Sequence, residues 1–437
     1  MHTLRIREYF NPKSRVIVPQ KLYTSFQHIN QVQNGPYHAY CDCLSHDRHP
    51  DVVYISSALM EQIRLQGRSH CQLQVIEDTC IFAYQLGVFI ASINHTNLSS
   101  ARHFSLYEEM SRIGQTFGFD TIFFGYQHVD LTSNKIEGYH FLDNQWKRTT
   151  TNIPPVIYNR IPNRKMESHP KIKIVKQVLN TTSIIFNPDF FNKWQMYEYL
   201  MKEEKCRYLL PYTIFQPSLN TIEEMMEQNA VYLKPIHGSK GNGICLIEKI
   251  DDQIAITNYK SHTALKQYYR DIDSFQAEYF PKGFQHYVLQ EAIPLMKHQG
   301  NAIDFRIHTN KDEQSNWQVT LIFGKQTSNK SFTTHITKGG SVLLLSQLFS
   351  AKEQKQIEQK LIETAINLSK IVDRSIHGTI GELGFDIGID EEKKLWLFEI
   401  NAKPGWMVFD HPQLSHLSRD VFSSLYQYAF FLQNNTE

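Results

Sequence analysis

The chain has 437 residues, of which 45 are Lys or Arg and 44 are Asp or Glu, so its formal net charge is +1. This balance gives no reason to expect a nucleic acid or an anionic membrane surface as partner, because both attract an excess of basic side chains. Hydrophobic residues make up 41% and aromatic residues 12%, which excludes a disordered chain and favours several packed domains.

The sequence contains no apolar run of about 18 residues, the length at which a membrane-spanning helix becomes a candidate. Its first residues, MHTLRIREYFNPKSR, lack the apolar core of a secretory signal peptide. Six cysteines in a chain of this length do not predict a disulfide framework. We therefore expect no membrane span and a reducing, intracellular compartment.

Residues 1–80 are predicted to form a strand-rich accessory domain. Short segments of alternating or β-branched residues, bounded by polar clusters, are typical of strands. The candidates are Leu4–Tyr9, Arg15–Leu22, Val52–Ile55 and Gln72–Ile76.

A cluster of Cys41, Cys43, His46 and His49 lies between these predicted strands. Cysteine and histidine are the ligands of structural zinc, so a zinc site is one interpretation. The Cys-x-Cys spacing is tighter than the usual gap between paired zinc ligands, and the segment is polar. An ordinary loop is therefore favoured.

Residues 81–173 are predicted to form a small α/β domain, because strands and a helix alternate and this order is typical of a parallel sheet. No G-x-G-x-x-G follows its first strand, so a dinucleotide site is not expected there. The predicted elements are strand Leu86–Ile90, helix Ser105–Phe117, strand Thr121–Phe124, a hairpin over Ile136–Trp146, strand Val156–Tyr158 and a linker over Asn159–Lys173.

A helix is predicted over Asp189–Glu204, with Lys193 in its first turn. A lysine at that position opposes the helix dipole and is mildly unfavourable unless an anion lies nearby. Two interpretations follow, an anion-binding lysine and a solvated surface lysine.

The segment Val231–Ile247 predicts a strand, a glycine-rich turn and a second strand. Glycines let the backbone approach a ligand closely and turn N–H groups toward phosphate oxygens. Lys234 ends the first strand, and the turn contains Gly238, Ser239, Lys240, Gly241 and Gly243. The turn is not a Walker A loop, which runs into a helix. A phosphate-covering loop and an ordinary glycine hairpin both remain open.

The next part of the chain continues with alternating strands and helices. In Ile303–Thr309 the alternation places Asp304, Arg306 and His308 on one face of a strand. The other predicted elements are a helical stretch over Tyr259–Glu278, strands Tyr287–Ile293 and Trp317–Phe323, a polar turn over Thr334–Ser341 that contains Lys338, and helices Lys352–Asp373 and Val421–Leu432.

The segment Gly381–Gly405 predicts a hairpin of two strands joined by a charged turn. With the turn at Glu391–Lys394, Asp386 lies opposite Glu399. Alternation then places Glu399 and Asn401 on one face, and Phe398 and Ile400 on the other. Oxygen ligands of this kind suit Mg²⁺. The alternative is a hairpin whose acidic face is simply solvated.

The order of these features resembles the ATP-grasp superfamily over roughly Phe186 to His411. The marks are the lysines, the glycine loop, Gln-Glu-x-Ile, Asp-x-Arg, Lys-Gly-Gly-Ser and the terminal Glu-Ile-Asn-x-x-Pro-Gly. The full chain, including Tyr158-Asn159-Arg160, looks most like the YheC/YheD group of spore-coat-associated proteins from endospore-forming bacteria. This resemblance implies an α/β (α+β) ATP-grasp domain over 174–430, which follows the two smaller domains in the chain. Within it, 231–290 would form the lid and 291–430 the metal- and acceptor-binding part.

The resemblance also implies roles for single residues. Lys193 and Lys234 would contact the α- and β-phosphates of ATP, and the loop of Gly238, Ser239, Lys240, Gly241 and Gly243 would close over them. The backbone around Gln290, Glu291 and Ile293 would bind adenine, with the Gln290 or Glu291 side chain reaching its amino group or the ribose. Arg306 and Lys338 would stabilise the transferred phosphoryl group or bind an acceptor carboxylate. Asp386, Glu399 and Asn401 would hold one or two Mg²⁺ ions.

These roles predict an ATP- and Mg²⁺-dependent carboxylate–amine ligase that works through an acyl phosphate, in the cytoplasm of the sporulating cell or at the spore coat. Its substrates would be a carboxylate and an amine, such as an amino acid or a peptide, and coat proteins would be its partners. The alternatives are a structural or assembly component of the coat that keeps the fold, and a kinase that phosphorylates a hydroxyl group. The sequence does not name the acceptor.

Overall fold

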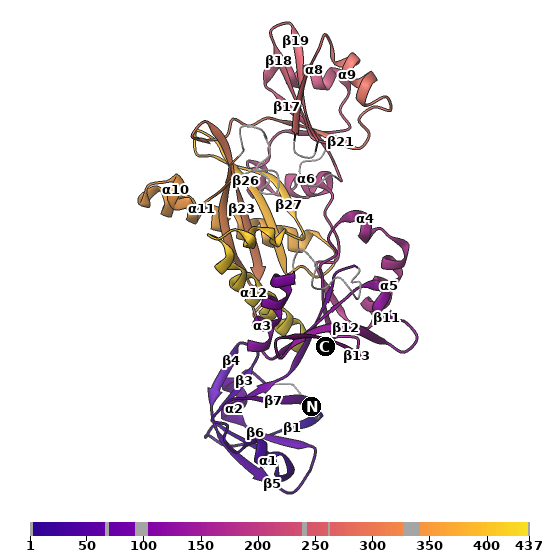
Figure 1. The fold of residues 1–437 in the computed structure, drawn as a ribbon. Helices are drawn as coiled ribbons and strands as arrows, with labels where there is room; N and C mark the ends of the chain where they lie inside the picture. The colour runs from indigo at the N-terminus through magenta and orange to yellow at the C-terminus, as the bar shows by residue number, and fades with distance from the viewer. Residues whose placement is uncertain are drawn as a thin grey trace. The chain divides into compact units, whose positions relative to one another are not determined.

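The structure is a computed structural model that describes residues 3–65, 70–91, 104–237, 243–260, 263–326 and 341–435. The described chain divides into two compact units, each with its own core (Figure 1). The first unit comprises 1–188, 310–316 and 416–437, and the second comprises 189–309 and 317–415. Among the described residues, no helix is both long enough and apolar enough to cross a membrane.

The N-terminal part of the first unit is a sheet with the strand order β4-β3-β8-β7-β1-β6-β2-β5. Its strands are β1 (Thr3–Tyr9), β2 (Arg15–Pro19), β3 (Gln31–Asn34), β4 (Tyr37–Tyr40), β5 (Asp42–His46), β6 (Val52–Ser56), β7 (His70–Ile76) and β8 (Thr79–Phe82), with helices α1 (Gln20–Phe26) and α2 (Ser57–Gln62). Strands β4 and β5 stand at opposite ends of this order, yet Cys41 alone separates them. The Cys41 N–H donates to the Asn30 carbonyl, and the Asp42 N–H donates to the Ser14 carbonyl. The sheet therefore closes on itself as a small barrel.

The second sheet of this unit has the order β11-β12-β10-β9-β14-β15, with β13 paired to β12. Its strands are β9 (Tyr84–Phe89), β10 (Phe119–Phe124), β11 (Val129–Asp130), β12 (Lys135–Leu142), β13 (Gln145–Asn152), β14 (Val156–Asn159) and β15 (Ile184–Phe186). The strands β10, β9, β14 and β15 pair in parallel, which confirms the parallel sheet expected from the alternation of strands and helix.

The helices of this unit are α3 (Phe104–Thr116), α4 (Arg164–Glu167), α5 (Pro170–Thr182) and α12 (Ser418–Asn434). Helix α12 is buried along most of its length, and its Tyr426 is fully buried. The Tyr426 hydroxyl is hydrogen-bonded to Thr121 Oγ1 at 2.6 Å. A Cβ atom at Gly114 of α3 would lie 2.5 Å from the Tyr426 ring, so only glycine permits this close approach.

The second unit contains two sheets. The first has the order β16-β21-β17-β18-β19-β20 and comprises β16 (Thr213–Phe215), β17 (Val231–Pro235), β18 (Cys245–Ile250), β19 (Gln253–Lys260), β20 (Thr263–Tyr269) and β21 (Tyr287–Glu291). Along β17 and β21, Val231, Leu233 and Leu289 belong to a core cluster that also includes residues of α8 (Leu219–Gln228) and α9 (Ile272–Tyr279). Alternation therefore turns Lys234 and Gln290 to the opposite face.

The other sheet of this unit has the order β25-β24-β23-β26-β27, with β22 paired to β23. It comprises β22 (Lys297–His298), β23 (Asn301–Lys311), β24 (Trp317–Gln326), β25 (Ser341–Leu343), β26 (Glu382–Ile389) and β27 (Leu395–Asn401). Its helices are α6 (Lys193–Met201), α7 (Glu204–Arg207), α10 (Leu345–Leu348) and α11 (Ala351–Ser375). The apolar stripe of α11, including Leu361 and Leu368, packs in one core with Phe305 and Phe385. The opposite face of the strands is left for polar side chains.

Three predictions about local structure are wrong in part. The polar segment at Cys41 is not a loop, because Asp42–His46 forms strand β5 and pairs in parallel with β2. The predicted linker Asn159–Lys173 contains α4 and the start of α5. The predicted helical stretch Tyr259–Glu278 begins as strands β19 and β20 and becomes helical only at Ile272. In each case pairing with neighbouring strands or packing against the core outweighed the polar composition.

Leu361→Ala should destabilise the second unit by about 2–5 kcal/mol, because Leu361 is fully buried and its truncation leaves a cavity. Leu265→Ala is the matched control, since Leu265 is 57% exposed in the same unit and its loss should change stability by less than about 0.5 kcal/mol. Urea unfolding followed by circular dichroism measures both. Equal shifts of the two midpoints would contradict the assigned core.

Candidate functional site

The β26–β27 hairpin presents acidic and amide side chains on the face that lies away from α11. Its register pairs Asp386 with Glu399 and Gly384 with Asn401, which confirms the expected position of the turn. The register shifts between Asp386 and Ile387, where Ile387 pairs with Leu397, so Phe398 is an extra residue in a β-bulge.

The bulge corrects the prediction that Phe398 shares the buried face with Ile400. Phe398 is only partly buried, and its ring lies over Gly388, where a Cβ atom would approach the ring to 2.5 Å. The Lys234 Nζ lies 5.7 Å from the centre of the same ring. Phe398 therefore lies on the same side of the hairpin as Glu399, and it places an aromatic surface beside the charged groups.

Asp386 is held by two cations from neighbouring strands. Its two carboxylate oxygens accept hydrogen bonds from Arg306 Nε at 2.9 Å and Arg306 Nη2 at 3.0 Å. The Lys325 Nζ donates to Asp386 Oδ1 at 2.6 Å and lies 3.2 Å from Asp304 Oδ1. The Asn401 amide also donates to Asp386 Oδ2, at 3.3 Å. The side chains of Lys325 and Asp386 are only 5% and 7% exposed, so these charges are buried together.

Glu399 forms its ion pair with Lys193, the first residue of helix α6. The Asn192 side chain caps this helix by accepting hydrogen bonds from the N–H groups of Trp194 and Gln195. A helix is confirmed here, but it begins at Lys193 and ends at Met201 and does not span the predicted Asp189–Glu204. Lys193 does lie in its first turn, and an anion, Glu399, lies nearby. A lysine at this end of the helix is therefore compensated.

Lys234 lies on the facing sheet and donates a hydrogen bond to Gln290 Oε1. The Gln290 amide in turn donates to Thr213 Oγ1 at 2.9 Å, so Thr213 fixes the orientation of the amide. Glu291 has a different partner, because its carboxylate accepts a hydrogen bond from the Tyr212 N–H at 2.7 Å. The Gln290 side chain is therefore directed at Lys234, whereas the Glu291 side chain is bonded to the backbone of Tyr212 at the end of β21.

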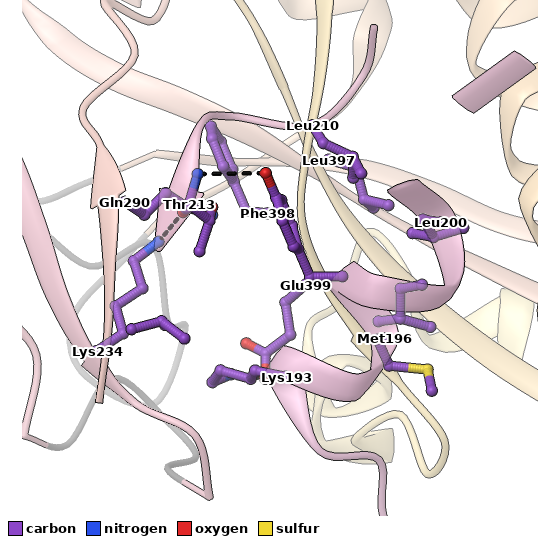
Figure 2. A pocket seen from close by; sticks show the side chains of 13 residues that line it. Lys193, Met196, Leu200, Leu210, Thr213, Lys234, Gln290, Leu397, Phe398 and Glu399 are labelled. Carbon is purple, nitrogen blue, oxygen red and sulfur yellow. Dashed lines mark hydrogen bonds and ion pairs between the residues drawn. The ribbon is translucent and has the colours of Figure 1, made fainter. Parts of the chain in front are cut away.

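Part of this set lines one pocket of the second unit (Figure 2). Its polar end carries Lys193, Glu399, Lys234 and Gln290, and Figure 2 shows Lys193 directed at Glu399 and Lys234 directed at Gln290. Its apolar lining includes Met196, Leu200, Leu210, Val288, Leu397 and Phe398. A mostly apolar pocket with a few charged groups at one end is typical of small-molecule sites. It suits a ligand with a flat apolar part and an anionic part.

Burial and charge alter the ionisation of the cations in this site. The pKa of Lys234 is lowered to about 8, mainly by burial and also by the nearby Lys193, while Glu399, Asp304 and Asp386 act in the opposite direction. For Arg306, burial lowers the pKa, but the charge and hydrogen bonds of Asp386 together with the charges of Glu399 and Asp304 outweigh it, and the net shift is upward. When fully ionised, Lys193, Lys234, Arg306 and Lys325 face Asp304, Asp386 and Glu399, which leaves one net positive charge.

The structure brings most of the predicted site residues together in the second unit. Lys193, Lys234, Gln290, Arg306, Asp386, Glu399 and Asn401 lie at the pocket or in its ion-pair network, and Glu291 and Ile293 follow on β21 and the segment after it. Gly243 is described and has a φ of +74°, which favours glycine. Gly238, Ser239, Lys240, Gly241 and Lys338 lie outside the described residues.

Sequence reasoning missed Lys325, Thr213 and Phe398. Lys325 ends an apolar strand without any motif, and Thr213 lies far from Gln290 in the chain, so neither has a local signal. Phe398 did have one, because the buried residues Leu395, Leu397 and Ile400 break the two-residue period of a strand with a step of three. Such a step is the sequence trace of a β-bulge.

The donor set on the hairpin fits Mg²⁺. Asp386, Glu399 and Asn401 supply only oxygen ligands on one face, and Mg²⁺ is usually held by one or two carboxylates together with substrate phosphates. Within the described part of the chain, no group of three or more Cys, His, Asp or Glu side chains is arranged to hold a metal by itself. Any metal here would therefore need ligands from a bound substrate.

Comparison with known proteins agrees with this geometry. The family described as YheC/D like ATP-grasp matches residues 183–432. The endospore coat-associated protein YheD of Bacillus subtilis (strain 168) is 31% identical over 402 residues, which cover 89% of this chain and 88% of that protein. The endospore coat-associated protein YheC of the same organism is 22% identical over 285 residues, covering 63% of this chain and 77% of that protein.

Among solved structures, D-alanyl-alanine synthetase A of Vibrio cholerae O1 is similar with a TM-score of 0.46 and 10% identity, and the match covers 80% of this chain and 99% of that one. The mixed α+β ATP-grasp fold expected from the sequence is confirmed by the family match. The chain belongs to the YheC/D-like ATP-grasp family.

Proposed function

We propose that the protein is an ATP- and Mg²⁺-dependent ligase that joins a carboxylate to an amine through an acyl phosphate. One observation carries the proposal. The cations Lys193, Arg306 and Lys325 pair with the carboxylates of Asp386 and Glu399, and Lys234 lies at the polar end of the adjoining, largely apolar pocket. Phosphoryl transfer depends mainly on positioning and on neutralising charge, and this site supplies both means.

The pocket suits ATP in one orientation. The adenine ring would occupy the apolar lining next to Phe398 and Val288, with the backbone of Gln290–Ile293 at its edge. The phosphates would then meet Lys193 and Lys234 at the polar end. We include the loop of Gly238, Ser239, Lys240, Gly241 and Gly243 in this proposal as the cover of the phosphates.

The chemistry follows from the charges. An oxygen of the substrate carboxylate attacks the γ-phosphorus, the bond from that phosphorus to the β–γ bridging oxygen breaks, and ADP leaves. The amine then attacks the acyl carbon of the acyl phosphate, inorganic phosphate leaves, and the nitrogen loses a proton. Arg306 and Lys338 are proposed to neutralise the transferred phosphoryl group or to hold the acceptor carboxylate. No nucleophilic side chain is needed.

Asp386, Glu399 and Asn401 are the residues proposed to hold Mg²⁺. When bound, the metal would neutralise phosphate charge and act as a Lewis acid on the transferred group. The carboxylates supply the negative charge that a divalent ion requires, and Asn401 keeps Asp386 oriented through its hydrogen bond at 3.3 Å.

The names of the two Bacillus subtilis relatives favour a place at the endospore coat. We propose that the protein acts in the cytoplasm of the sporulating cell or at the coat, on an amino acid, a peptide or a coat protein. Those names also motivate the second candidate, a structural or assembly component of the coat that keeps nucleotide binding without ligase chemistry. The intact set of buried charges favours the enzyme, because unused buried charges destabilise a fold.

Asp386→Asn and Glu399→Gln should each abolish ATP turnover, because each removes a carboxylate proposed to hold the metal. Glu391→Gln is the control, since Glu391 is an exposed residue in the turn of the same hairpin. Turnover is measured as ADP release in a screen of amino acids and short peptides, with product masses. Turnover in these two variants equal to that of the wild type would contradict the assignment of Asp386 and Glu399 as the residues that hold the metal. Binding of Mg-ATP without turnover on any acceptor would favour the coat component, and phosphate transfer to a hydroxyl without amide formation would favour a kinase.

The affinity for ADP should fall as the pH rises from 7 to 9. Lys234 has a pKa of about 8, so it loses its proton and its attraction for phosphate within this range. The fall should approach about tenfold per pH unit above pH 8, the limit for one proton. Lys234→Arg should flatten the profile, because arginine stays charged. Calorimetry at fixed ionic strength measures both profiles. A steep fall that persists in the arginine variant would show that another group is responsible.

A further inference from the structure

We propose that Lys325 blocks the metal-binding carboxylate Asp386 and releases it only when nucleotide phosphates are present, with Asp304 as the carboxylate that keeps the displaced ammonium. Lys325 is then a positioning residue that makes metal binding depend on nucleotide. This inference rests on the proposed function, because it concerns the same metal site.

The first argument is the position of the Lys325 ammonium. It lies 2.6 Å from Asp386 Oδ1, a carboxylate oxygen that a metal would need, and only 5% of the Lys325 side chain is exposed. A metal ion in contact with that oxygen and an ammonium at hydrogen-bond distance from it would repel each other strongly in a buried site. The ammonium must therefore move when the metal binds.

The second argument is that Lys325 has a place to move to. Its ammonium is already 3.2 Å from Asp304 Oδ1, so a small shift replaces one carboxylate partner by another. Asp304 lies on β23, two residues from Arg306 and on the same face. A second partner for Lys325 would explain why the carboxylate of Asp304 is buried here, since the proposed metal and phosphate sites do not use it.

The third argument separates Lys325 from Arg306. The Arg306 guanidinium binds Asp386 through Nε and Nη2 at 2.9 and 3.0 Å, a planar arrangement that fixes both groups. Lysine carries a compact charge on a flexible stem and changes partners more easily. Arg306 holds Asp386 in place, and Lys325 is the cation that moves.

The fourth argument is charge balance. Asp304 and Asp386 are balanced by Arg306 and Lys325, and Glu399 is paired with Lys193. A divalent cation added alone would place two positive charges on groups that are already neutral. A nucleoside di- or triphosphate brings the negative charge that draws the lysines away and leaves the carboxylates for the metal.

The test is a titration of the full chain with Mn²⁺, followed by electron paramagnetic resonance, without nucleotide and with saturating ADP. For Lys325→Gln we expect the affinity for Mn²⁺ without nucleotide to rise about tenfold or more, because a like charge next to the metal is removed. Its affinity with ADP should change less. Lys325→Arg should restore the weak wild-type affinity without nucleotide, which a merely structural role of residue 325 would not predict.

Two control variants sharpen the result. Lys176→Gln removes a lysine that is paired with Glu167 at similar burial in the other unit, and it should leave Mn²⁺ binding unchanged. Asp304→Asn removes a negative charge and should not raise the affinity without nucleotide. Lys325→Met takes the place of Lys325→Gln in the same titration if the glutamine variant does not fold.

The outcomes separate the two proposals. Suppose that the wild type binds Mn²⁺ in the presence of ADP, and that in the absence of ADP Lys325→Gln binds Mn²⁺ no more tightly than the wild type does. The role of Lys325 is then overturned, and the ligase proposal stands. The role of Lys325 is also overturned if Asp304→Asn raises the affinity for Mn²⁺ without nucleotide as much as Lys325→Gln does. If the wild type binds no Mn²⁺ under either condition, the proposed metal site fails, and the inference fails with it.

Discussion

The buried ion pairs of Asp386 are the constraint on which the second unit depends. A carboxylate that is 7% exposed is strongly destabilising unless cations and hydrogen bonds compensate it, and removing one partner of such a pair typically costs about 3–5 kcal/mol. Arg306, Lys325 and Asn401 provide that compensation from three different strands. The sheet order β24-β23-β26-β27 therefore brings Lys325, Arg306, Asp386 and Asn401 together, one from each strand.

The apolar layer beneath the charges keeps them in register. Phe305 and Phe385 are fully buried against α11, and they alternate with Arg306 and Asp386 on the same strands. A shift of one residue in either strand would turn the charged side chains into the core and the aromatic rings outward. The core and the site thus specify the same pairing. The bulge at Phe398 is the one departure from alternation in β27, and it occurs where the pocket needs an apolar wall.

Much of this arrangement was accessible from the sequence. The hairpin register follows from the turn at Glu391–Lys394, and the apolar stripe of α11 follows from helical periodicity. These features are local, so short spacings encode them. Lys325 and Thr213 are different, because their partners lie 61 and 77 residues away in the chain. Their roles arise from the order and packing of the sheets, which cannot be inferred from residue spacing in a single sequence.

The mistaken segments have a related cause. Thr263–Tyr269 is rich in polar residues and suits a helix as well as a strand, and pairing with β19 decides between them. Asp42–His46 looked like a loop because its residues are mostly polar, while its pairing with β2 makes it a strand. The composition of a segment indicates whether its side chains can be exposed to water. It does not show which neighbouring strand pairs with the backbone of that segment.

The closure of the N-terminal barrel by the segment Tyr37–His46 limits how this domain can meet another protein. Because the same segment pairs with β3 through Tyr37–Tyr40 and with β2 through Asp42–His46, it covers one edge of each of these two strands. A foreign strand cannot add to β3 or β2 on that side without displacing this segment. Outward side chains such as Tyr40, which is 76% exposed, instead offer a surface that a partner could recognise by its chemistry.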